Sequence, residues 1–247
     1  MGRGVARHVQ QAPGHNRGGK RRGAGRPAKG PRSSERHKKR ATLKKHEPVH
    51  VVLRADEAVG QLRRREIYKA LRGALVTTFT RDDFRIVHVS IQGTHVHLLV
   101  EADNRLALGA GMKAFGISAA KRINAALPPT ADGKRRRGTV FPDRYHAQII
   151  RTPRQARHGL AYVLNNWHKH GLVAKDWPID PFSTGPSFTG WRDLQPSMIE
   201  WPPTYEPLPV WEAKTWLLRE GWKKHGLIGS REVPGSKVKG IALALAE

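Results

Sequence analysis

Two histidines of this chain, His95 and His97, are separated by a single residue in an otherwise apolar stretch. In a β-strand the side chains alternate between the two faces of the sheet, so these two imidazoles share one face. Val96, Leu98 and Val100 then share the other face, and their apolar character predicts that this face covers a core. Paired imidazoles suit a shared cation or a shared anion. A purely structural role is the alternative that the spacing leaves open.

A tyrosine and an asparagine, Tyr162 and Asn166, are four residues apart in a stretch with helical periodicity. Residues with this spacing lie on one face of a helix, one turn apart. The apolar stripe of the same predicted helix consists of Ala156, Leu160, Val163 and Trp167. Tyr162 lies beside this stripe and not within it, which favours a chemical role. A half-buried boundary tyrosine is the alternative.

Together, these residue types suggest phosphodiester chemistry. A tyrosine phenol can act as a nucleophile when a nearby cation favours the phenolate. A divalent metal held by His95, His97 and the amide oxygen of Asn166 would polarise a phosphodiester and orient it for in-line attack. Because a phosphotyrosine bond conserves the energy of the broken bond, strand transfer would need no ATP. Phosphate and water oxygens suit Mg²⁺, and the mixed donor set also suits Mn²⁺.

The elements that must position these residues follow a recognisable order. Short β-branched or alternating stretches predict strands over residues 49–55, 84–92, 95–101 and 145–150. Apolar residues at intervals of three and four predict helices over residues 61–79, 108–123 and 152–171. The first six elements match the ferredoxin-like split βαβ pattern, an α+β fold in which an antiparallel sheet has helices on one face. The other face is then free for a site.

The helix that carries Tyr162 has clear start and stop signals. Thr152 as N-cap, Pro153 at the first helical position and Gln155 two residues later fit a capping box. Gly171 suits the left-handed conformation that commonly follows a helix.

Charge indicates the partner. Lys and Arg number 45 against 20 Asp and Glu, which gives a formal net charge of +25. Such an excess favours a polyanion, and nucleic acid is the leading candidate. An anionic membrane is disfavoured because the chain contains no run of 18 apolar residues. The chain has no cysteine, which excludes disulfides, a cysteine nucleophile and cysteine-ligated zinc. We expect a cytoplasmic, nucleoid-associated protein.

Composition divides the chain into three parts. Residues 1–46 hold 15 Lys or Arg and one acid, and we interpret them as a disordered basic DNA-binding arm. Residues 47–171 form the predicted nuclease-like domain. Residues 172–247 hold six of the seven Trp and nine of the 17 Pro, and they predict an extended wrap with a helix within residues 207–226. We interpret the Trp side chains as packing anchors, with base stacking as the alternative.

The residues His95-Val96-His97 and the stretch YVLNN, Tyr162 to Asn166, resemble the HUH single-tyrosine transposases of the insertion-sequence and REP-associated kinds. The resemblance covers about residues 48–171. It implies a ferredoxin-like nuclease that acts on single-stranded or hairpin DNA. By this resemblance Tyr162 would form a 5′-phosphotyrosine, His95 and His97 would bind a metal, and Asn166 would occupy the position of a third ligand. Members often form homodimers in which one subunit's tyrosine helix completes the other's site.

This sequence departs from the family pattern at one position, because Trp167 follows Asn166 where the family commonly has Asn-Pro. One alternative function is a catalytically inactive relative that only binds DNA. Another is a basic chromatin or RNA-binding protein, which would explain the arm but not the histidine pair. A 2H phosphoesterase would need two His-x-Ser/Thr motifs, and only His88-Val89-Ser90 fits.

Several further residues have two possible roles. Two basic clusters are either solvated surface or phosphate contacts: Arg63, Arg64, Arg65 and Arg135, Arg136, Arg137. His168 and His170 are interpreted as cations at a helix C-terminus, where the helix dipole favours positive charge. Tyr145 is the rival nucleophile, but it begins a strand and has no helical amide partner.

Overall fold

The computed structural model describes residues 41–129, 132–172 and 177–232. The predicted basic arm lies outside these residues as far as position 40. The strands are β1 (Val49–Arg54), β2 (Phe84–Ile91), β3 (His95–Ala102) and β4 (His146–Ile149). The long helices are α1 (Arg65–Val76), α2 (Arg105–Ala126) and α3 (Pro153–Lys169), and a short helix, α4 (Trp216–Arg219), follows near the end. All four predicted strands are therefore confirmed, to within two residues at each end.

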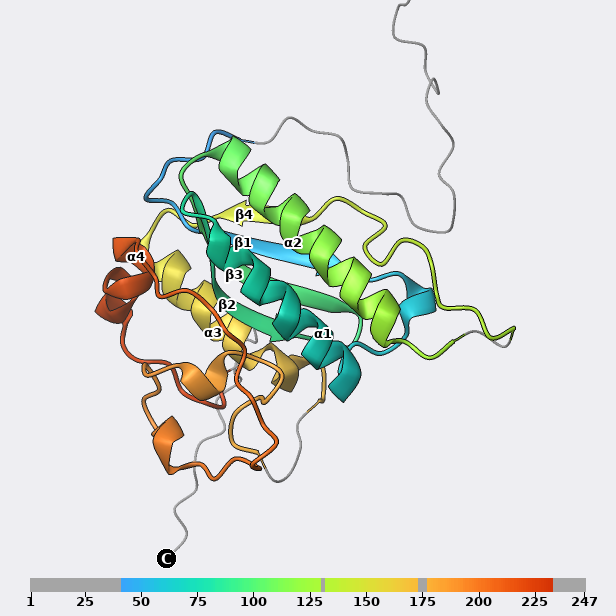
Figure 1. The fold of residues 1–247 in the computed structure, drawn as a ribbon. Helices are drawn as coiled ribbons and strands as arrows, with labels where there is room; N and C mark the ends of the chain where they lie inside the picture. The colour runs from blue at the N-terminus through green and yellow to red at the C-terminus, as the bar shows by residue number, and fades with distance from the viewer. Residues whose placement is uncertain (1–40, 130–131, 173–176, 233–247) are drawn as a thin grey trace, which may run out of the picture. The chain divides into compact units, whose positions relative to one another are not determined.

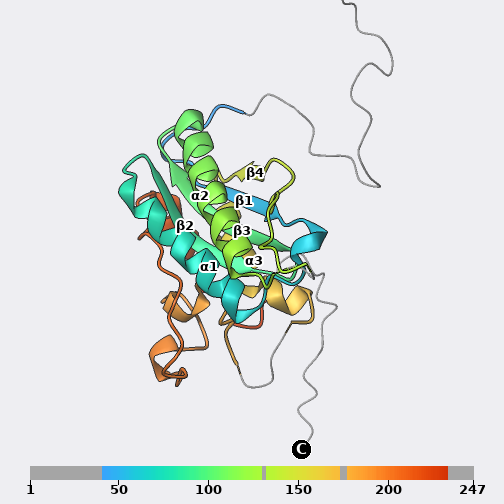
Figure 2. The same cartoon turned by 45° about the vertical axis from the view of Figure 1, so that its right-hand side comes forward.

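The four strands form one antiparallel sheet in the order β2-β3-β1-β4 (Figures 1 and 2). Each of the crossovers through α1 and α2 links strands that are separated by one antiparallel neighbour. This is the ferredoxin-like split βαβ arrangement that the element order predicts. A β-bulge lies between Ile86 and His88 in the pairing of β2 with β3.

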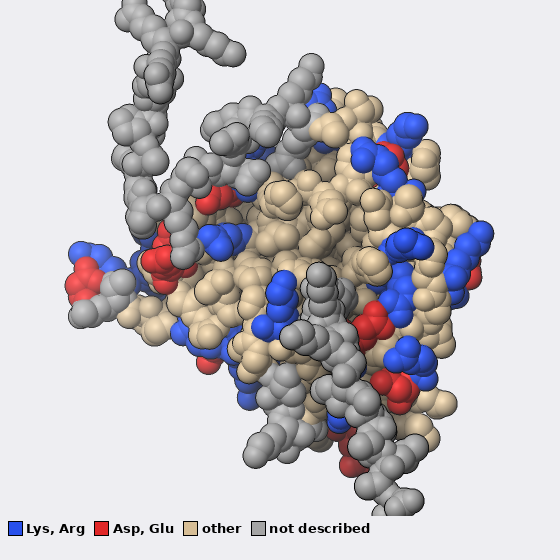
Figure 3. Space-filling model, turned by 180° about the vertical axis from the view of Figure 1, so that it is seen from behind, with Lys and Arg blue, Asp and Glu red and all other residues tan. Residues whose placement is uncertain are grey.

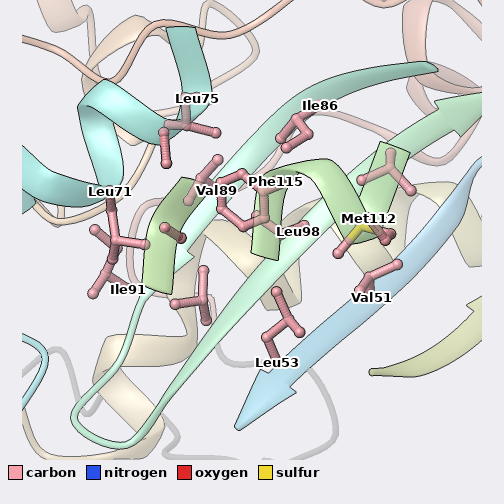
Figure 4. Packing of buried hydrophobic residues seen from close by; sticks show 14 of the residues in the cluster. Val51, Leu53, Leu71, Leu75, Ile86, Val89, Ile91, Leu98, Met112 and Phe115 are labelled. Atoms are coloured by element: carbon pink, nitrogen blue, oxygen red, sulfur yellow. The ribbon is translucent and has the colours of Figure 1, made fainter. Parts of the chain in front are cut away.

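Helices α1 and α2 cover one face of the sheet and build the larger core. Figure 4 shows Phe115 and Met112 of α2 among the side chains of β1, β2 and β3, with Leu71 and Leu75 of α1 beside them. The close approach of α2 to the sheet depends on Gly111, because a Cβ atom there would lie 2.1 Å from the ring of Phe84.

The first helix ends earlier than its apolar pattern predicts. Its α-helical part stops at Val76, and a 3-10 turn, Thr77–Thr80, follows. The hydroxyl of Thr77 donates to the carbonyl of Ala74 and that of Thr78 to the carbonyl of Leu75, both at 2.7 Å. Threonine side chains that compete for backbone carbonyls in this way weaken the continuation of a helix.

Helix α3 lies on the opposite face of the sheet, the face that the split βαβ pattern leaves open (Figure 1). All four residues of its predicted apolar stripe are buried, and Ala156, Leu160 and Val163 belong to a second core. Leu99 of β3 belongs to this core, whereas Val96, Leu98 and Val100 belong to the first. The alternation of β3 therefore assigns its two faces as predicted.

The chain after α3 runs along the free edge of β2. The amide of Ile91 donates to the carbonyl of Phe182 at 2.8 Å, and the amide of Thr184 donates to the carbonyl of Val89 at 2.9 Å. Further along, the amide of Trp211 donates to the carbonyl of Ile86 at 2.9 Å. This pairing covers an edge that would otherwise be open to other chains.

The helix predicted within residues 207–226 is much shorter than its pattern indicates. Only α4 and a 3-10 turn, Gly221–His225, are helical. The buried carboxylate of Glu101 accepts hydrogen bonds from the amides of Lys214 and Thr215. Because these amides and that of Trp211 bond to the sheet, this part of the backbone is extended.

In the described part of the chain, no helix combines the length and apolar character that crossing a membrane requires.

Candidate active site

Three histidines gather on the α3 side of the sheet. In the register of β1 with β3, Val52 lies opposite His97 and Arg54 lies opposite His95. His50 is two residues before Val52 on the same face of β1, and its Nε2 lies 3.0 Å from Nδ1 of His97 in a hydrogen bond. The His95 and His97 ring centroids are 4.6 Å apart, as expected for one face of a strand.

Helix α3 places Tyr162 against these histidines. The tyrosine ring is edge-on to His97 at a centroid distance of 5.2 Å and to His50 at 5.6 Å. The ammonium group of Lys169 lies 5.5 Å from the Tyr162 ring centroid. The Tyr162 ring and the histidine rings that it contacts belong to the same chain.

The predicted capping signals fix where α3 begins and ends. The hydroxyl of Thr152 accepts a hydrogen bond from the amide of Gln155 at 3.2 Å, and the Gln155 side chain accepts one from the amide of Arg151 at 2.8 Å. Gly171 has φ of 63°, the left-handed conformation that favours glycine after a helix.

The C-terminal segment holds α3 in place from its outer side. Asn165 Nδ2 donates to the carbonyls of Gly229 and Glu232, both at 2.8 Å. The guanidinium of Arg157 pairs with the carboxylate of Glu232, with one contact at 2.9 Å. Because Asn165 faces this segment, the next residue, Asn166, is turned about 100° away from it around the helix.

Three buried polar atoms near Tyr162 have no hydrogen-bond partner among the described residues: His97 Nε2, Asn166 Oδ1 and Asn166 Nδ2. Buried polar atoms nearly always have a partner, so unpaired ones call for a ligand or ion. Since Nδ1 of His97 is already bonded to His50, Nε2 is the nitrogen left for a ligand. His97 Nε2 and the amide of Asn166 are therefore available as donors to a divalent metal. Within the described residues no group of three His, Cys, Asp or Glu is arranged around a metal position, so the third protein donor would be the amide.

Burial keeps the histidines neutral. It lowers the pKa of His97 to about 2, with further lowering by the neighbouring His50, His95 and His170 and by Lys169. Burial, with a contribution from His146, lowers the pKa of His50 to about 4, and burial together with His170 and Arg54 lowers that of His95 to about 4. Neutral imidazoles are the form that binds metals.

A cavity of about 530 Å³ opens beside the cluster. Its lining includes His50, His97 and Tyr162, with Lys169 and His158 from α3. This volume is within the roughly 300–1,000 Å³ typical of ligand sites. Figure 3 shows the molecule from this side, where Lys and Arg side chains lie at several places on the visible surface, with Asp and Glu among them.

Three residues near Tyr162 were not predicted from the sequence as site residues: His50, His170 and Lys169. His50 lies in a strand in which Val49, Val51 and Leu53 form the core face, so alternation alone places it on the site face. His170, interpreted as a helix-end cation, has its ring 5.3 Å from that of His95 and so borders the site. The pairing of His50 with His97 needs the strand register, which the sequence does not reveal.

The arginines of the two predicted basic clusters differ in their surroundings: some bond within the fold and others are exposed. Arg63 donates to both carboxylate oxygens of the buried Asp180, at 3.0 and 2.8 Å, and to the carbonyl of Ile91, so its guanidinium is engaged inside the fold. We therefore leave it out of the proposed DNA surface. Arg64 donates to backbone carbonyls within its own loop, whereas Arg65 is exposed.

In the second cluster Arg136 bonds to Asn124 and to the carbonyl of Thr139, and Arg135 and Arg137 are exposed. The rival nucleophile, Tyr145, borders a different cavity, on the α2 side of the sheet. It is not a part of the histidine cluster.

Comparison of the chain with known protein families and solved structures identifies the family to which it belongs. Residues 44–166 match the model of a family described as IS200-like transposases. A solved structure of a REP-associated tyrosine transposase bound to a REP hairpin is 20% identical, with a TM-score of 0.48, over 61% of this chain and 82% of that chain. A candidate transposase from Deinococcus radiodurans R1 is 16% identical, with a TM-score of 0.33, over 47% of this chain and 85% of that chain. No match is found among curated proteins. Over residues 44–166, about half of its length, the chain belongs to the IS200-like transposase family.

Proposed function

We propose that this transposase cleaves and transfers strands of single-stranded or hairpin DNA through a covalent 5′-phosphotyrosine at Tyr162. His95, His97 and Asn166 would hold the divalent metal, Mg²⁺ or Mn²⁺. The observation that carries the proposal is the placement of the Tyr162 ring 5.2 Å from the His97 ring, beside buried donor atoms that have no partner among the described residues.

In the proposed reaction Tyr162 Oη attacks the phosphorus of a DNA phosphodiester. The bond from phosphorus to the 3′ oxygen breaks, and the 5′ phosphate remains on the tyrosine. The phenol proton passes to water in the cavity, and the departing 3′ oxygen takes a proton from water to become a hydroxyl. A 3′ hydroxyl that attacks the phosphotyrosine reverses these bond changes, so a strand is rejoined or transferred without ATP.

Each side chain around Tyr162 has a definite part in this proposal. His50 bonds to Nδ1 of His97 and so leaves Nε2 to face the ligand. Lys169 places a positive charge beside the tyrosine ring, where phosphate oxygens would arrive. A bound metal would polarise the phosphodiester and neutralise charge that develops on its oxygens.

DNA as the partner is supported by the charge of the chain and by the family. The excess of Lys and Arg supplies the sequence-independent phosphate attraction that nucleic-acid binding requires. Arg65, Arg135 and Arg137 are exposed and remain proposed phosphate contacts. The homodimer stays a prediction.

The proposal is tested by incubating the protein with end-labelled hairpin DNA that carries single-stranded flanks, in the presence of Mn²⁺. We expect a covalent adduct on a denaturing gel, its loss in Tyr162→Phe, and its retention in the matched control Tyr145→Phe. Mixing Tyr162→Phe with His97→Ala should not restore the adduct if each chain uses its own tyrosine. Wild-type protein that binds the DNA without forming an adduct would favour the inactive-binder alternative.

A further inference from the structure

A third concave site lies on the α1 side of the sheet, away from Tyr162. It is a cavity of about 190 Å³ between α1 and the C-terminal segment. Tyr68 of α1, Phe182 and Tyr205 line it with aromatic rings, and Arg65 and Lys69 line it with cations. We call these five residues the aromatic pocket. Its volume is below the roughly 300–1,000 Å³ of sites for drug-sized ligands, which suits a single ring system.

The rings of the aromatic pocket are held rigidly. Tyr68 Oη donates to the carbonyl of Glu206 at 2.7 Å, and Tyr205 Oη donates to the carbonyl of Pro181 at 3.2 Å. Tyr68 is edge-on to Phe182, with centroids 5.5 Å apart. Burial raises the pKa of Tyr68 to about 12 and raises that of Tyr205 as well, so both phenols are uncharged and would not repel a phosphate. Fixed rings bind a partner with little loss of side-chain entropy.

An aromatic stack continues outward from Tyr205. Its ring lies 4.5 Å from that of Trp201, which in turn stacks on Trp177 at 4.7 Å with an interplanar angle of 4°. All three side chains are only half-buried, unlike Trp191 and Trp222, which are buried packing anchors. Half-buried stacked rings beside cations are typical of proteins that bind unpaired bases.

The cations of the aromatic pocket have no structural explanation. Neither Arg65 nor Lys69 has a carboxylate partner among the residues that the structure describes, and both are exposed. Arg65 begins α1, where the helix dipole disfavours a positive charge, so helix stability does not explain it. Arg72 differs, because it pairs with Glu206 at 2.8 Å.

The aromatic pocket lies at the end of the sheet where β3 begins with His95. The amide of Leu62 donates to the carbonyl of Gly93 in the turn between β2 and β3, and Arg63 bonds to Ile91. The carbon of the Arg63 guanidinium lies 4.4 Å above the Phe182 ring. A DNA strand that leaves the histidine cluster would reach the pocket by turning around this end of the sheet.

We infer that the aromatic pocket binds an unpaired nucleotide of the DNA strand, several positions away from the cleaved phosphate. Its base would stack among the rings of Tyr68, Phe182 and Tyr205, and its phosphates would contact Arg65 and Lys69. This inference rests on the proposed function, since it takes DNA as the ligand. It adds a site that recognises single-stranded character outside the catalytic cluster.

The test uses the full chain in EDTA, so that binding is measured without cleavage. The probe is a hairpin with a short single-stranded extension that carries one 2-aminopurine, moved along the extension in separate oligonucleotides. Stacking quenches this base, so we expect quenching at one position in wild type and in Tyr205→Phe, and its loss in Tyr205→Leu. The Leu variant should bind about 5- to 150-fold more weakly, the range for losing one stacked base.

Charge variants keep the test valid if Tyr205→Leu fails to fold. The exposed pair Arg65→Ala and Lys69→Ala should weaken binding of the extended hairpin and reduce the slope of log affinity against log salt by about one per lost phosphate contact. The charge-matched control Lys113→Ala and Lys121→Ala, on exposed positions of α2, should leave quenching unchanged. A blunt hairpin, which has no single-stranded extension, should bind the Arg65/Lys69 double variant and the Lys113/Lys121 double variant with equal affinity.

Wild-type affinity and quenching in both the Leu variant and the Arg65/Lys69 pair would overturn the inference. Preference for single-stranded RNA of the same sequence over DNA would also overturn it. Failure of the proposed function looks different, because it is absence of the Tyr162 adduct. Quenching that depends on Tyr205 would persist in that case.

Discussion

Nε2 of His50 and Nδ1 of His97 are 3.0 Å apart and joined by a hydrogen bond across the β1–β3 pair. This bond settles which nitrogen of His97 is free, because only Nε2 then remains for a ligand. A group that fixes the ring of a metal-binding histidine is a common feature of metal sites, although a carboxylate or carbonyl usually supplies it. In the proposed site a second neutral imidazole, that of His50, would do so.

Replacing His50 tests this relationship. If Nδ1 of His97 donates to His50, His50→Phe removes the acceptor and should weaken Mn²⁺ binding roughly 10- to 100-fold. Glutamine offers an acceptor oxygen of similar reach, so His50→Gln should retain most of the affinity. Calorimetric titration with Mn²⁺ measures both. Equal affinity in wild type and His50→Phe would show that this bond does not orient the site.

The adjacent asparagines of α3 should separate stability from metal binding. Asn165→Ala leaves the carbonyls of Gly229 and Glu232 without their donor, which should lower the free energy of unfolding by about 1–3 kcal/mol. Asn166→Ala removes two unpaired buried atoms and should cost little stability but weaken Mn²⁺ binding. Urea unfolding and metal titration of both variants check this. Loss of metal affinity in Asn165→Ala alone would reverse the two assignments.

Acid should destabilise the metal-free protein through its buried histidines. The pKa values of His50, His88 and His95 are lowered from 6.5 to about 4, so below pH 6.5 the unfolded chain binds protons that the folded chain does not. The free energy of unfolding should therefore be highest above pH 6.5 and fall as the pH drops toward about 4. Urea unfolding in EDTA measures the slope, and His88→Gln should make it shallower. A flat profile across this window would show that the histidines are not buried as described.

Local patterns in the sequence predict the frame of the site well. The alternation in β3 separates His95 and His97 from the core residues, and the capping residues of α3 fix its start. The apolar stripe of α3 then sets the direction of Tyr162. Each of these signals depends only on residues within a single strand or helix, so it can be recognised in a single sequence without knowledge of the tertiary contacts.

Contacts between distant segments account for what the sequence did not predict. The bond between His50 and His97 depends on strand register, and the pair of Arg63 with Asp180 joins residues 117 positions apart. Arg63 therefore resembles a surface cation in the sequence, whereas in the fold it is a half-buried residue paired with the buried Asp180. The path of the C-terminal segment has no periodic pattern, because its backbone bonds to the edge of β2 and to Glu101.

The most direct measurement is to identify both ends of the covalent bond that the protein forms with DNA. Adduct made with hairpin DNA and Mn²⁺ is digested with trypsin and nuclease and analysed by mass spectrometry. We expect a single modified peptide in which Tyr162 carries a 5′-phosphate, together with a released strand that ends in a free 3′ hydroxyl. An adduct on another residue, or a 3′-phosphotyrosine at Tyr162, would contradict the proposed mechanism.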